Sequence, residues 1–298
     1  MCGIVGLFIK NDTLKPQLGT LLTDMLITMT DRGPDSAGIA VYRNSPPDMG
    51  KITVQSNSPE SEFDELKTKL SVLFDYTVSI MLKDSHAVLS LPKDKSEETR
   101  NTLKSVFPKL RIMSSGETIE IYKEVGLAKD VTKRFSINKV SGSHGIGHTR
   151  MATESAVTTM GAHPFSTGND QCLVHNGSLS NHNSLRRQLQ REGMRIETLN
   201  DSEVAAAYLT YKLNSGYDLK SAMEQSLEDL DGFFTFVIGT KNGFGVVRDP
   251  IACKPAVMAE TSQFVAFGSE YKALATLPDI DNAKIWEPEP ATVYFWEH

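Results

Sequence analysis

The first nine residues constrain the fold more than any other part of the chain. Cys2 follows Met1 directly, and the apolar run Gly3–Ile9 follows the cysteine without a polar linker. Such a run is typical of a buried strand, so the chain must begin at the edge of its own core. Removal of Met1 would put a thiol and a free α-amine on Cys2, and enzymes use such an amine to activate a nucleophile. The alternative is that Cys2 is a small buried apolar side chain, as free cysteine often is.

Composition indicates an ordinary globular chain. Its 298 residues, 40% hydrophobic and 23% charged, allow one large domain with a smaller unit inserted. The 31 basic and 37 acidic residues give a net charge of −6, and the absence of a basic run with interleaved aromatic residues argues against nucleic-acid binding. Three widely spaced cysteines favour a reducing compartment. No signal peptide or membrane span is predicted, so we expect a cytoplasmic location away from membranes.

Hydrophobic spacing predicts strands and helices on both sides of a separate middle segment. A strand at 3–9, a helix from Pro16 and a strand at 37–42 come first. The segment 51–139 then follows the order of a ferredoxin-like βαββαβ module, with 119–125 as a possible extension. Its strands are expected at 52–54, 76–82, 86–91 and 110–113, and its helices at 60–73 and 96–107. The segment offers no nucleophile and base pair, and its His86 fits a structural role, so we expect an insertion that supports the fold or contacts a partner.

Polar motifs follow the insertion, each at the end of a predicted strand or the start of a helix. They are His148-Thr149-Arg150-Met151-Ala152-Thr153, His175-Asn176-Gly177 and Asp201-Ser202-Glu203. Each has an ordinary explanation when taken alone. Asn-Gly often forms a hairpin turn, although the helical pattern at 181–191 argues against one here. Asp201 fits a helix N-cap, and Arg150 fits an exposed surface.

Taken together and in this order, the motifs resemble the class II glutamine amidotransferases, a branch of the N-terminal nucleophile hydrolases. The resemblance also includes Met1-Cys2-Gly3-Ile4-Val5-Gly6, Arg32-Gly33-Pro34-Asp35-Ser36-Ala37-Gly38, Ala162-His163-Pro164-Phe165, Asp231-Gly232-Phe233-Phe234, Arg248-Asp249-Pro250 and Gly268-Ser269-Glu270. It covers nearly the whole chain outside the insertion. It implies an α+β fold, a four-layer α-β-β-α sandwich over residues 2–298, with the ferredoxin-like module at 51–139 inserted.

The resemblance also implies a catalytic set. Cys2 matches the nucleophile that attacks the side-chain amide of glutamine, and its α-amine would take the thiol proton and later protonate the departing ammonia. Asn176 and the backbone N–H of Gly177 match the oxyanion hole. Such a donor typically contributes about 2.7 to 4 kcal/mol of transition-state stabilisation.

The remaining matched positions would bind the two charges of glutamine. Arg150 matches the residue that binds the α-carboxylate, for which a planar guanidinium is well suited. Asp201 matches the acidic residue that holds the α-ammonium group, and Thr153 adds polar contacts. Two departures concern the pocket rim and the subfamily: Asp31 stands where many members carry His or Tyr, and Glu154-Ser155 replaces a glycine- or histidine-containing continuation. His148, His163 and His175 lie in metal-free motifs, so no metal is expected.

The end of the chain predicts a partner. After a predicted strand at 291–296 the sequence stops at His298, without a second catalytic domain. We expect a subunit of a hetero-oligomer that delivers ammonia to a synthase. The closest resemblance is to the standalone amidotransferase subunits of N-methylglutamate synthase and glutamate synthase-like complexes. No cofactor is expected on this chain, and a flavin would belong to the partner.

Three alternatives stay open at the level of sequence. The first is transfer of ammonia to a phosphoribosyl or sugar-phosphate acceptor. The second is a free-standing amide hydrolase with an N-terminal nucleophile, which would act without a partner. The third is a non-catalytic interaction subunit, which would retain Met1.

Overall fold

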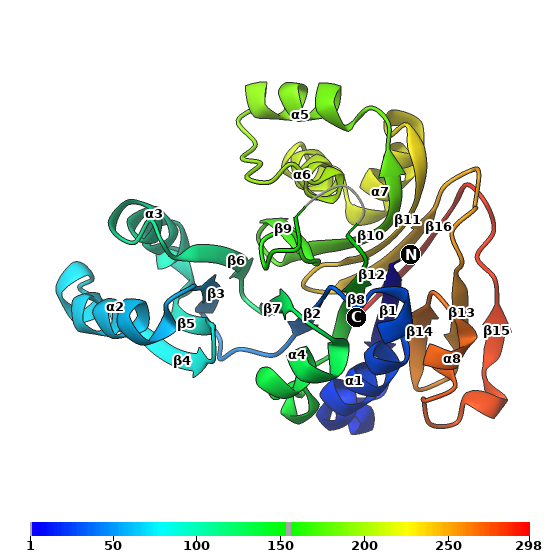
Figure 1. The fold of residues 1–298 in the computed structure, drawn as a ribbon, viewed down its shortest axis with the longest axis horizontal. Helices are drawn as coiled ribbons and strands as arrows, with labels where there is room; N and C mark the ends of the chain where they lie inside the picture. Colours follow the sequence, from blue (N-terminus) through cyan, green and yellow to red (C-terminus); the bar gives the residue numbers. More distant parts are fainter. Residues whose placement is uncertain (1, 153–155) are drawn as a thin grey trace.

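The core consists of two antiparallel β-sheets that face each other, with helices on both outer faces (Figure 1). A computed structural model describes residues 2–152 and 156–298. Within these ranges no helix is long and apolar enough to cross a membrane. The layers run helix, sheet, sheet, helix, as expected for the α+β sandwich.

The larger sheet contains the first strand of the chain in its interior. Its seven strands lie in the order β15 (Lys284–Trp286), β13 (Val257–Glu260), β14 (Phe264–Gly268), β1 (Gly3–Ile9), β8 (His144–Arg150), β2 (Ser36–Tyr42) and β7 (Ile119–Val125). Its outer face is covered by α1 (Leu18–Thr28), α4 (Ala128–Arg134) and α8 (Tyr271–Leu274). The predicted strands at 3–9 and 37–42 and the helix after Pro16 are confirmed, with 12–17 forming a 3-10 turn before α1.

The second sheet has five strands in the order β16 (Thr292–Glu297), β12 (Gly243–Arg248), β11 (Gly232–Gly239), β10 (Gln171–Leu179) and β9 (Phe165–Gly168). Its outer face packs against α6 (Asp201–Asn214) and α7 (Leu219–Asp229), and α5 (His182–Arg191) packs on α6. Asn176-Gly177 does not form a hairpin turn. Instead β10 runs on to Leu179 and pairs with β11, and α5 follows, as the helical pattern had suggested.

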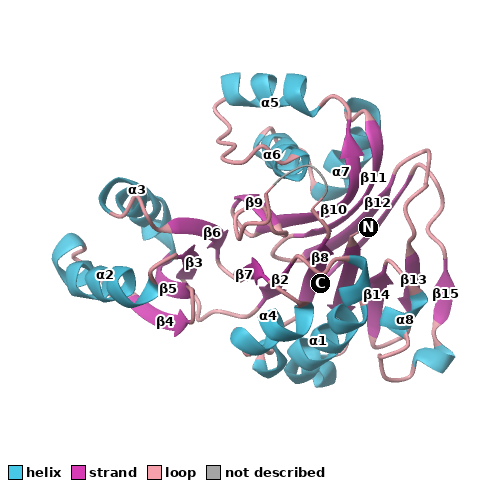
Figure 2. Cartoon of the chain, viewed as in Figure 1, coloured by secondary structure: helices cyan, strands magenta, loops and turns pink. Residues whose placement is uncertain are grey.

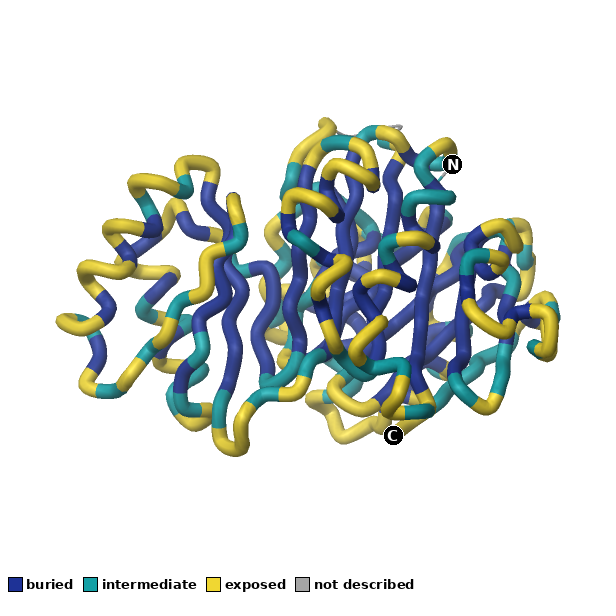
Figure 3. The backbone as a smooth tube through the Cα atoms, turned by 90° about the horizontal axis from the view of Figure 1, so that it is seen from below, coloured by how far each residue is buried: buried dark blue, intermediate teal, exposed yellow. Residues whose placement is uncertain are grey.

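Strand β1 is buried on both faces, which explains its uninterrupted apolar sequence. Ile4 and Phe8 pack between the two sheets, whereas Val5, Leu7 and Ile9 pack against the helix layer that contains α1. Side chains alternate between the faces of a strand, so each face here meets its own apolar layer. Figure 3 shows the central strands of the large sheet buried along most of their length.

The inserted segment forms a separate layer at one side of the molecule (Figure 2). Its elements are β3 (Met49–Gln55), α2 (Pro59–Leu73), β4 (Ser79–Lys83), β5 (His86–Pro92), α3 (Ser96–Val106) and β6 (Arg111–Gly116). The strands form an antiparallel sheet in the order β4-β5-β3-β6, and α2 and α3 share its apolar core. The predicted order of strands and helices is therefore observed between residues 49 and 116.

The boundary predicted at residue 139 lies too far along the chain. Strand β7 pairs with β2 of the large sheet, from Ser36 opposite Val125 to Tyr42 opposite Ile119, and α4 packs on α1. Both elements therefore belong to the core rather than to the four-stranded unit. Local periodicity predicted β7 correctly but could not choose between two sheets, because strand pairing is decided by long-range contacts.

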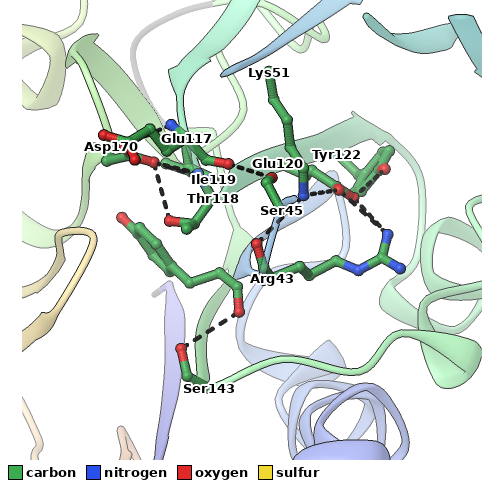
Figure 4. A network of polar contacts seen from close by, with 11 residues as sticks. Arg43, Ser45, Lys51, Glu117, Thr118, Ile119, Glu120, Tyr122, Ser143 and Asp170 are labelled. Atoms are coloured by element: carbon green, nitrogen blue, oxygen red, sulfur yellow. Dashed lines mark hydrogen bonds and ion pairs between the residues drawn. The ribbon is translucent and has the colours of Figure 1, made fainter. Parts of the chain in front are cut away.

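A buried ion-pair network joins the inserted unit to the core (Figure 4). The Glu120 carboxylate of β7 accepts hydrogen bonds from Lys51 Nζ of β3 at 2.8 Å, Arg43 Nη1 at 3.0 Å and Tyr122 Oη at 2.8 Å. Burial raises the pKa of Glu120, but Lys51 and Arg43 outweigh burial, so this pKa lies below its usual value. The carboxylate thus stays charged, and each cation keeps its partner.

A second clamp fixes the turn from β6 into β7. Asp170, between β9 and β10, accepts hydrogen bonds from the backbone N–H groups of Glu117, Thr118 and Ile119 at 2.6, 2.8 and 3.0 Å. A Cβ atom at Gly116 would lie 2.3 Å from Asp170 Cγ, so this approach needs glycine. The turn between module and core is therefore held by the second sheet as well.

Glu120→Gln tests the network. The substitution leaves Lys51 and Arg43 without their counter-charge, so we expect the free energy of unfolding to fall by about 3 kcal/mol in chemical denaturation. Glu65→Gln removes a carboxylate of the exposed pair between Glu65 and Lys69 and should leave stability unchanged. Equal stabilities of the two variants would contradict a structural role for Glu120.

Candidate active site

Cys2 is the residue directly before β1 of the large sheet, and a residue of the second sheet also contacts it. Its backbone carbonyl accepts hydrogen bonds from Arg32 Nε at 3.0 Å and from Asn176 Nδ2 at 3.3 Å. Its Sγ atom lies 4.0 Å from the carbonyl oxygen of Met151. The side chain is neither fully buried nor fully exposed, unlike Cys172, which is buried. The purely apolar interpretation of Cys2 therefore does not fit its surroundings, which are polar.

Arg32 connects Cys2 to a distant carboxylate. It follows α1 in the turn Thr30–Arg32, and its Nη1 lies 2.6 Å from Glu270 Oε1. The hydrogen bond from Arg32 is the main reason that the pKa of Glu270 lies below its usual value. Ser269 adds a second tie, since its Oγ accepts from the Ile4 N–H at 2.9 Å. The sequence motifs that contain these three residues predicted no role for them.

Asn176 and Gly177 lie on β10, beside the end of β1. Asn176 is buried, and its side-chain amide points to the Cys2 carbonyl. Gly177 has φ of +153°, and a Cβ atom there would lie 2.0 Å from the Phe233 carbonyl oxygen. Only glycine can therefore bring the strand this close to β11 at this point.

Arg150 is the last residue of β8, and it is buried. Its Nη1 donates to the Ala156 carbonyl at 3.4 Å, and a Cβ atom at Gly161 would lie 3.3 Å from the same nitrogen. The backbone around Arg150 is held by Asp35, whose N–H donates to the Arg150 carbonyl at 3.1 Å and whose carboxylate accepts from the Ala152 N–H at 2.8 Å. Thr153 lies outside the described residues.

Asp201 is the first residue of α6 rather than its N-cap. Asn200 is the cap, because its side chain accepts from the Ser202 N–H. This leaves the Asp201 carboxylate directed toward β10, where Oδ2 accepts from the Leu179 N–H at 2.9 Å and Oδ1 lies 3.7 Å from His175 Nδ1. A carboxylate is favoured at a helix N-terminus by the helix dipole.

Three buried histidines fill the space behind these residues. Ser202 Oγ lies 2.8 Å from His163 Nε2 and 2.9 Å from His175 Nδ1, and the rings of His148 and His163 stack at 4.0 Å. Burial lowers the pKa of His148 to about 3 and also lowers the pKa values of His163 and His175. The trio is therefore uncharged near neutral pH. Among the described residues, no group of three or more His, Cys, Asp or Glu side chains could hold a metal ion.

The strand registers place the predicted site residues that the structure describes at one end of the two sheets. Gly3 lies opposite Thr149 of β8, and Asn176 lies opposite Thr235, which in turn faces Arg248. Cys2 directly precedes Gly3, and Arg150 directly follows Thr149. Asn176 lies in the second row, and Asp201 is tied to the end of β10. A thiol, an amide donor, a guanidinium and a carboxylate thus share one region. Such a set can attack an amide and bind a zwitterionic amino acid.

Comparison with known proteins identifies the family of the chain. Residues 148–276 match the family model described as "Glutamine amidotransferase domain". The "Glutamine amidotransferase-like protein GlxB" of Rhizobium meliloti is 63% identical over 298 residues, which cover 100% of this chain and 99% of that protein. The chain belongs to the glutamine amidotransferase family. A full-length relative from Methanothermobacter thermautotrophicus is 32% identical over 329 residues and is covered to 99%.

Two solved structures show the fold of the family. Glutamine phosphoribosylpyrophosphate amidotransferase from B. subtilis, in complex with ADP and GMP, superposes on this chain with a TM-score of 0.62 at 20% identity. An allosteric regulatory enzyme of purine biosynthesis superposes with a TM-score of 0.65, also at 20% identity. Each match covers 99% of this amidotransferase chain but only 47% of the solved chain. The chain therefore shares the fold of these two structures and spans about half the length of those two proteins.

Arg32→Gln tests the tie between Arg32 and Cys2. Loss of the charge bound to Glu270 should let the Cys2 carbonyl shift, and a displacement of about 1 Å can cost on the order of a hundredfold in rate. We expect the kcat of glutamine hydrolysis to fall by about ten- to a hundredfold, with little change in KM. Arg134→Gln, at a half-exposed arginine that pairs with Asp84 and Glu124, is the control. A kcat equal to that of the control would rule out the positioning role.

Proposed function

We propose that this chain hydrolyses glutamine to glutamate and ammonia through Cys2 after removal of Met1, and delivers the ammonia to a synthase partner. The proposal rests on one observation: the main-chain carbonyl of Cys2 accepts hydrogen bonds from Asn176 and Arg32, which come from two separate elements. These contacts place Cys2 beside Asn176, the amide donor of the proposed oxyanion hole, while its side chain stays partly exposed. The family membership gives the reaction class.

The proposed reaction follows from the groups at this end of the sheets. The free α-amine of Cys2 takes the thiol proton, and Sγ attacks the side-chain carbon of glutamine. The oxyanion that forms is stabilised by Asn176 Nδ2 and the N–H of Gly177. The protonated amine then gives its proton to the leaving nitrogen, which departs as ammonia, and water hydrolyses the thioester to glutamate.

The substrate's two charges would be bound on opposite sides of this centre. The Arg150 guanidinium suits the α-carboxylate of glutamine, and the Asp201 carboxylate, whose side chain is 22% exposed, suits the α-ammonium group. We assign Thr153 to the same binding region as a further polar contact. The uncharged histidines behind Asp201 add no positive charge that would compete with the ammonium group.

Cys2→Ala should abolish glutamine turnover, measured as glutamate release by purified protein. Cys253→Ala is the matched control, because Cys253 is also a free cysteine but is exposed and belongs to a different loop. We expect full activity in the control. Glutaminase activity that persists in Cys2→Ala would refute the mechanism.

Apolar residues at the same end of the sheets support a partner for ammonia delivery. Leu199 and Ile251 are 89% and 64% exposed, and both lie beside elements that carry the site, directly before Asn200 and after the end of β12. Val125 and Met151 add exposed apolar surface at the ends of β7 and β8. We propose that these four side chains form one apolar patch, since contiguous exposed apolar surface is typical of a protein interface. Ammonia released there would be kept from water if a partner covered this end.

We further propose that the acceptor belongs to a glutamate synthase-like complex, such as N-methylglutamate synthase. This assignment is supported by the resemblance of the N-terminal half and the inserted module to the standalone subunits of such complexes. Any flavin would lie on the partner, and this chain would need no cofactor. We assign the inserted unit to the ferredoxin-like folds, on the basis of its strand order β4-β5-β3-β6.

Native purification tests the partner. The tagged chain should retain a second subunit, identified by mass spectrometry, and glutaminase activity should rise when the acceptor of that subunit is added. Leu199→Glu with Ile251→Glu should lose the subunit. Val72→Glu, at an 84% exposed residue of α2, should retain it. A monomer with full activity and no bound subunit would overturn the proposal of ammonia delivery.

A further inference from the structure

A cavity of about 400 Å³ lies at the junction of the inserted unit and the core. Helix α3 and strand β6 of the insertion form one wall. Strands β7 and β9, the loop 193–198 and helix α6 form the other walls. A volume of this size is in the range of small-molecule sites. None of the candidate residues of the glutamine site that the structure describes lines it.

The cavity carries more positive charge than the protein itself neutralises. Its lining contains four basic residues, Arg100, Lys104, Lys123 and Arg195, and two acidic ones, Glu197 and Glu203. Both acids already have partners. Glu203 accepts hydrogen bonds from the Glu197 and Thr198 N–H groups and from Thr198 Oγ1, at 2.8, 2.5 and 2.6 Å, and Glu197 pairs with Arg195 at 2.8 Å.

None of the other three basic residues forms an ion pair with a described carboxylate, although the charges of Glu203 and Glu197 act on Lys123 and Lys104 and favour their charged forms. Arg100 Nη1 donates to Asn169 Oδ1 at 3.1 Å, whereas its buried Nε finds no acceptor among the described residues. Burial lowers the pKa of Lys104, and the nearby charges of Arg195 and Arg100 lower it further. These cations therefore converge on one space from two different parts of the fold.

Lys123 is the buried amine of the lining, and burial lowers its pKa to about 7, so it carries only part of a positive charge near neutral pH. It is buried on β7, and its Nζ donates to the carbonyls of Ala162 and Pro164 at 2.8 and 3.2 Å and lies 4.6 Å from the centre of the Phe165 ring. The ring and the carbonyls stabilise a cation without supplying a full negative charge. Ser114 Oγ, also in the lining and buried, has no hydrogen-bond partner among the described residues. The cavity is thus rich in donors and short of acceptors.

We infer that this cavity binds a small phosphate-bearing anion, held by Arg100 and Lys104 of the insertion together with Arg195 of the core. The donors of Arg100 and Lys104 require a ligand with several acceptor oxygens, and these two cations, which form no ion pair with a described carboxylate, call for a dianion. A phosphate group meets both conditions, and arginine and lysine are its common ligands. The insertion would then supply half of a ligand site, which the glutaminase reaction does not require.

Binding of inorganic pyrophosphate to the full-length chain, measured by isothermal titration calorimetry at fixed ionic strength, tests the inference. Arg100→Gln with Lys104→Gln should weaken binding at least about tenfold, since hydrogen bonds to charged groups are the strong ones. Lys109→Gln with Lys129→Gln removes the same charge from exposed positions outside the cavity and should bind like the wild type. Citrate at the same ionic strength should bind more weakly than pyrophosphate.

Two results would overturn the inference: equal affinity in the two double variants, or binding of pyrophosphate no tighter than that of citrate. Lysine acylation provides a second measurement on the unaltered protein, in case the variant does not fold. Pyrophosphate should protect Lys104 but not Lys109 from the reagent, as read by mass spectrometry. Equal labelling of Lys104 with and without pyrophosphate would also contradict the proposed site.

Discussion

Burial of β1 on both faces is the constraint on which the rest of this structure depends. The strand lies between β8 and β14 in the large sheet, with the second sheet on one side and the layer of α1 on the other. Sliding the strand by one residue would exchange its two buried faces, so its register is strongly fixed. Cys2 is the residue directly before it. The position of the thiol is therefore set by the packing of the core, and not by a loop.

Charged and polar residues hold the main chain of Cys2 in the position that the apolar packing of β1 gives it. Arg32, from the turn after α1, and Glu270, from the turn before α8, form an ion pair whose arginine also holds the Cys2 carbonyl. Asn176 reaches the same carbonyl from the opposite sheet. Because these contacts come from three distant parts of the chain, they can form only when both sheets are assembled. Competence of the site is in this way coupled to complete folding of the core.

The inserted unit is attached by a different kind of interaction. It has an apolar core of its own between its sheet and its two helices, and it meets β7 through Glu120, Lys51 and the Asp170 turn. A buried ion pair adds less net stability than apolar packing, but it requires a defined arrangement of its charged groups. This attachment fixes the orientation of the unit, and with it the cavity whose cations come from both sides. The insertion is thus held firmly enough to share a ligand site with the core.

The sequence by itself determined the elements and the candidate residues. The apolar run 3–9 was a doubly buried strand, and the strand and helix order between 49 and 116 was readable, because periodicity is a local property. Ordered motifs were sufficient to select Cys2, Arg150, Asn176 and Asp201. Only the tertiary structure decided that β7 leaves the insertion, that Asn200 rather than Asp201 caps α6, and that Arg32 joins Glu270 to Cys2. Those outcomes depend on contacts between residues up to 238 positions apart, and no local pattern encodes which distant partner a strand or a charge will meet.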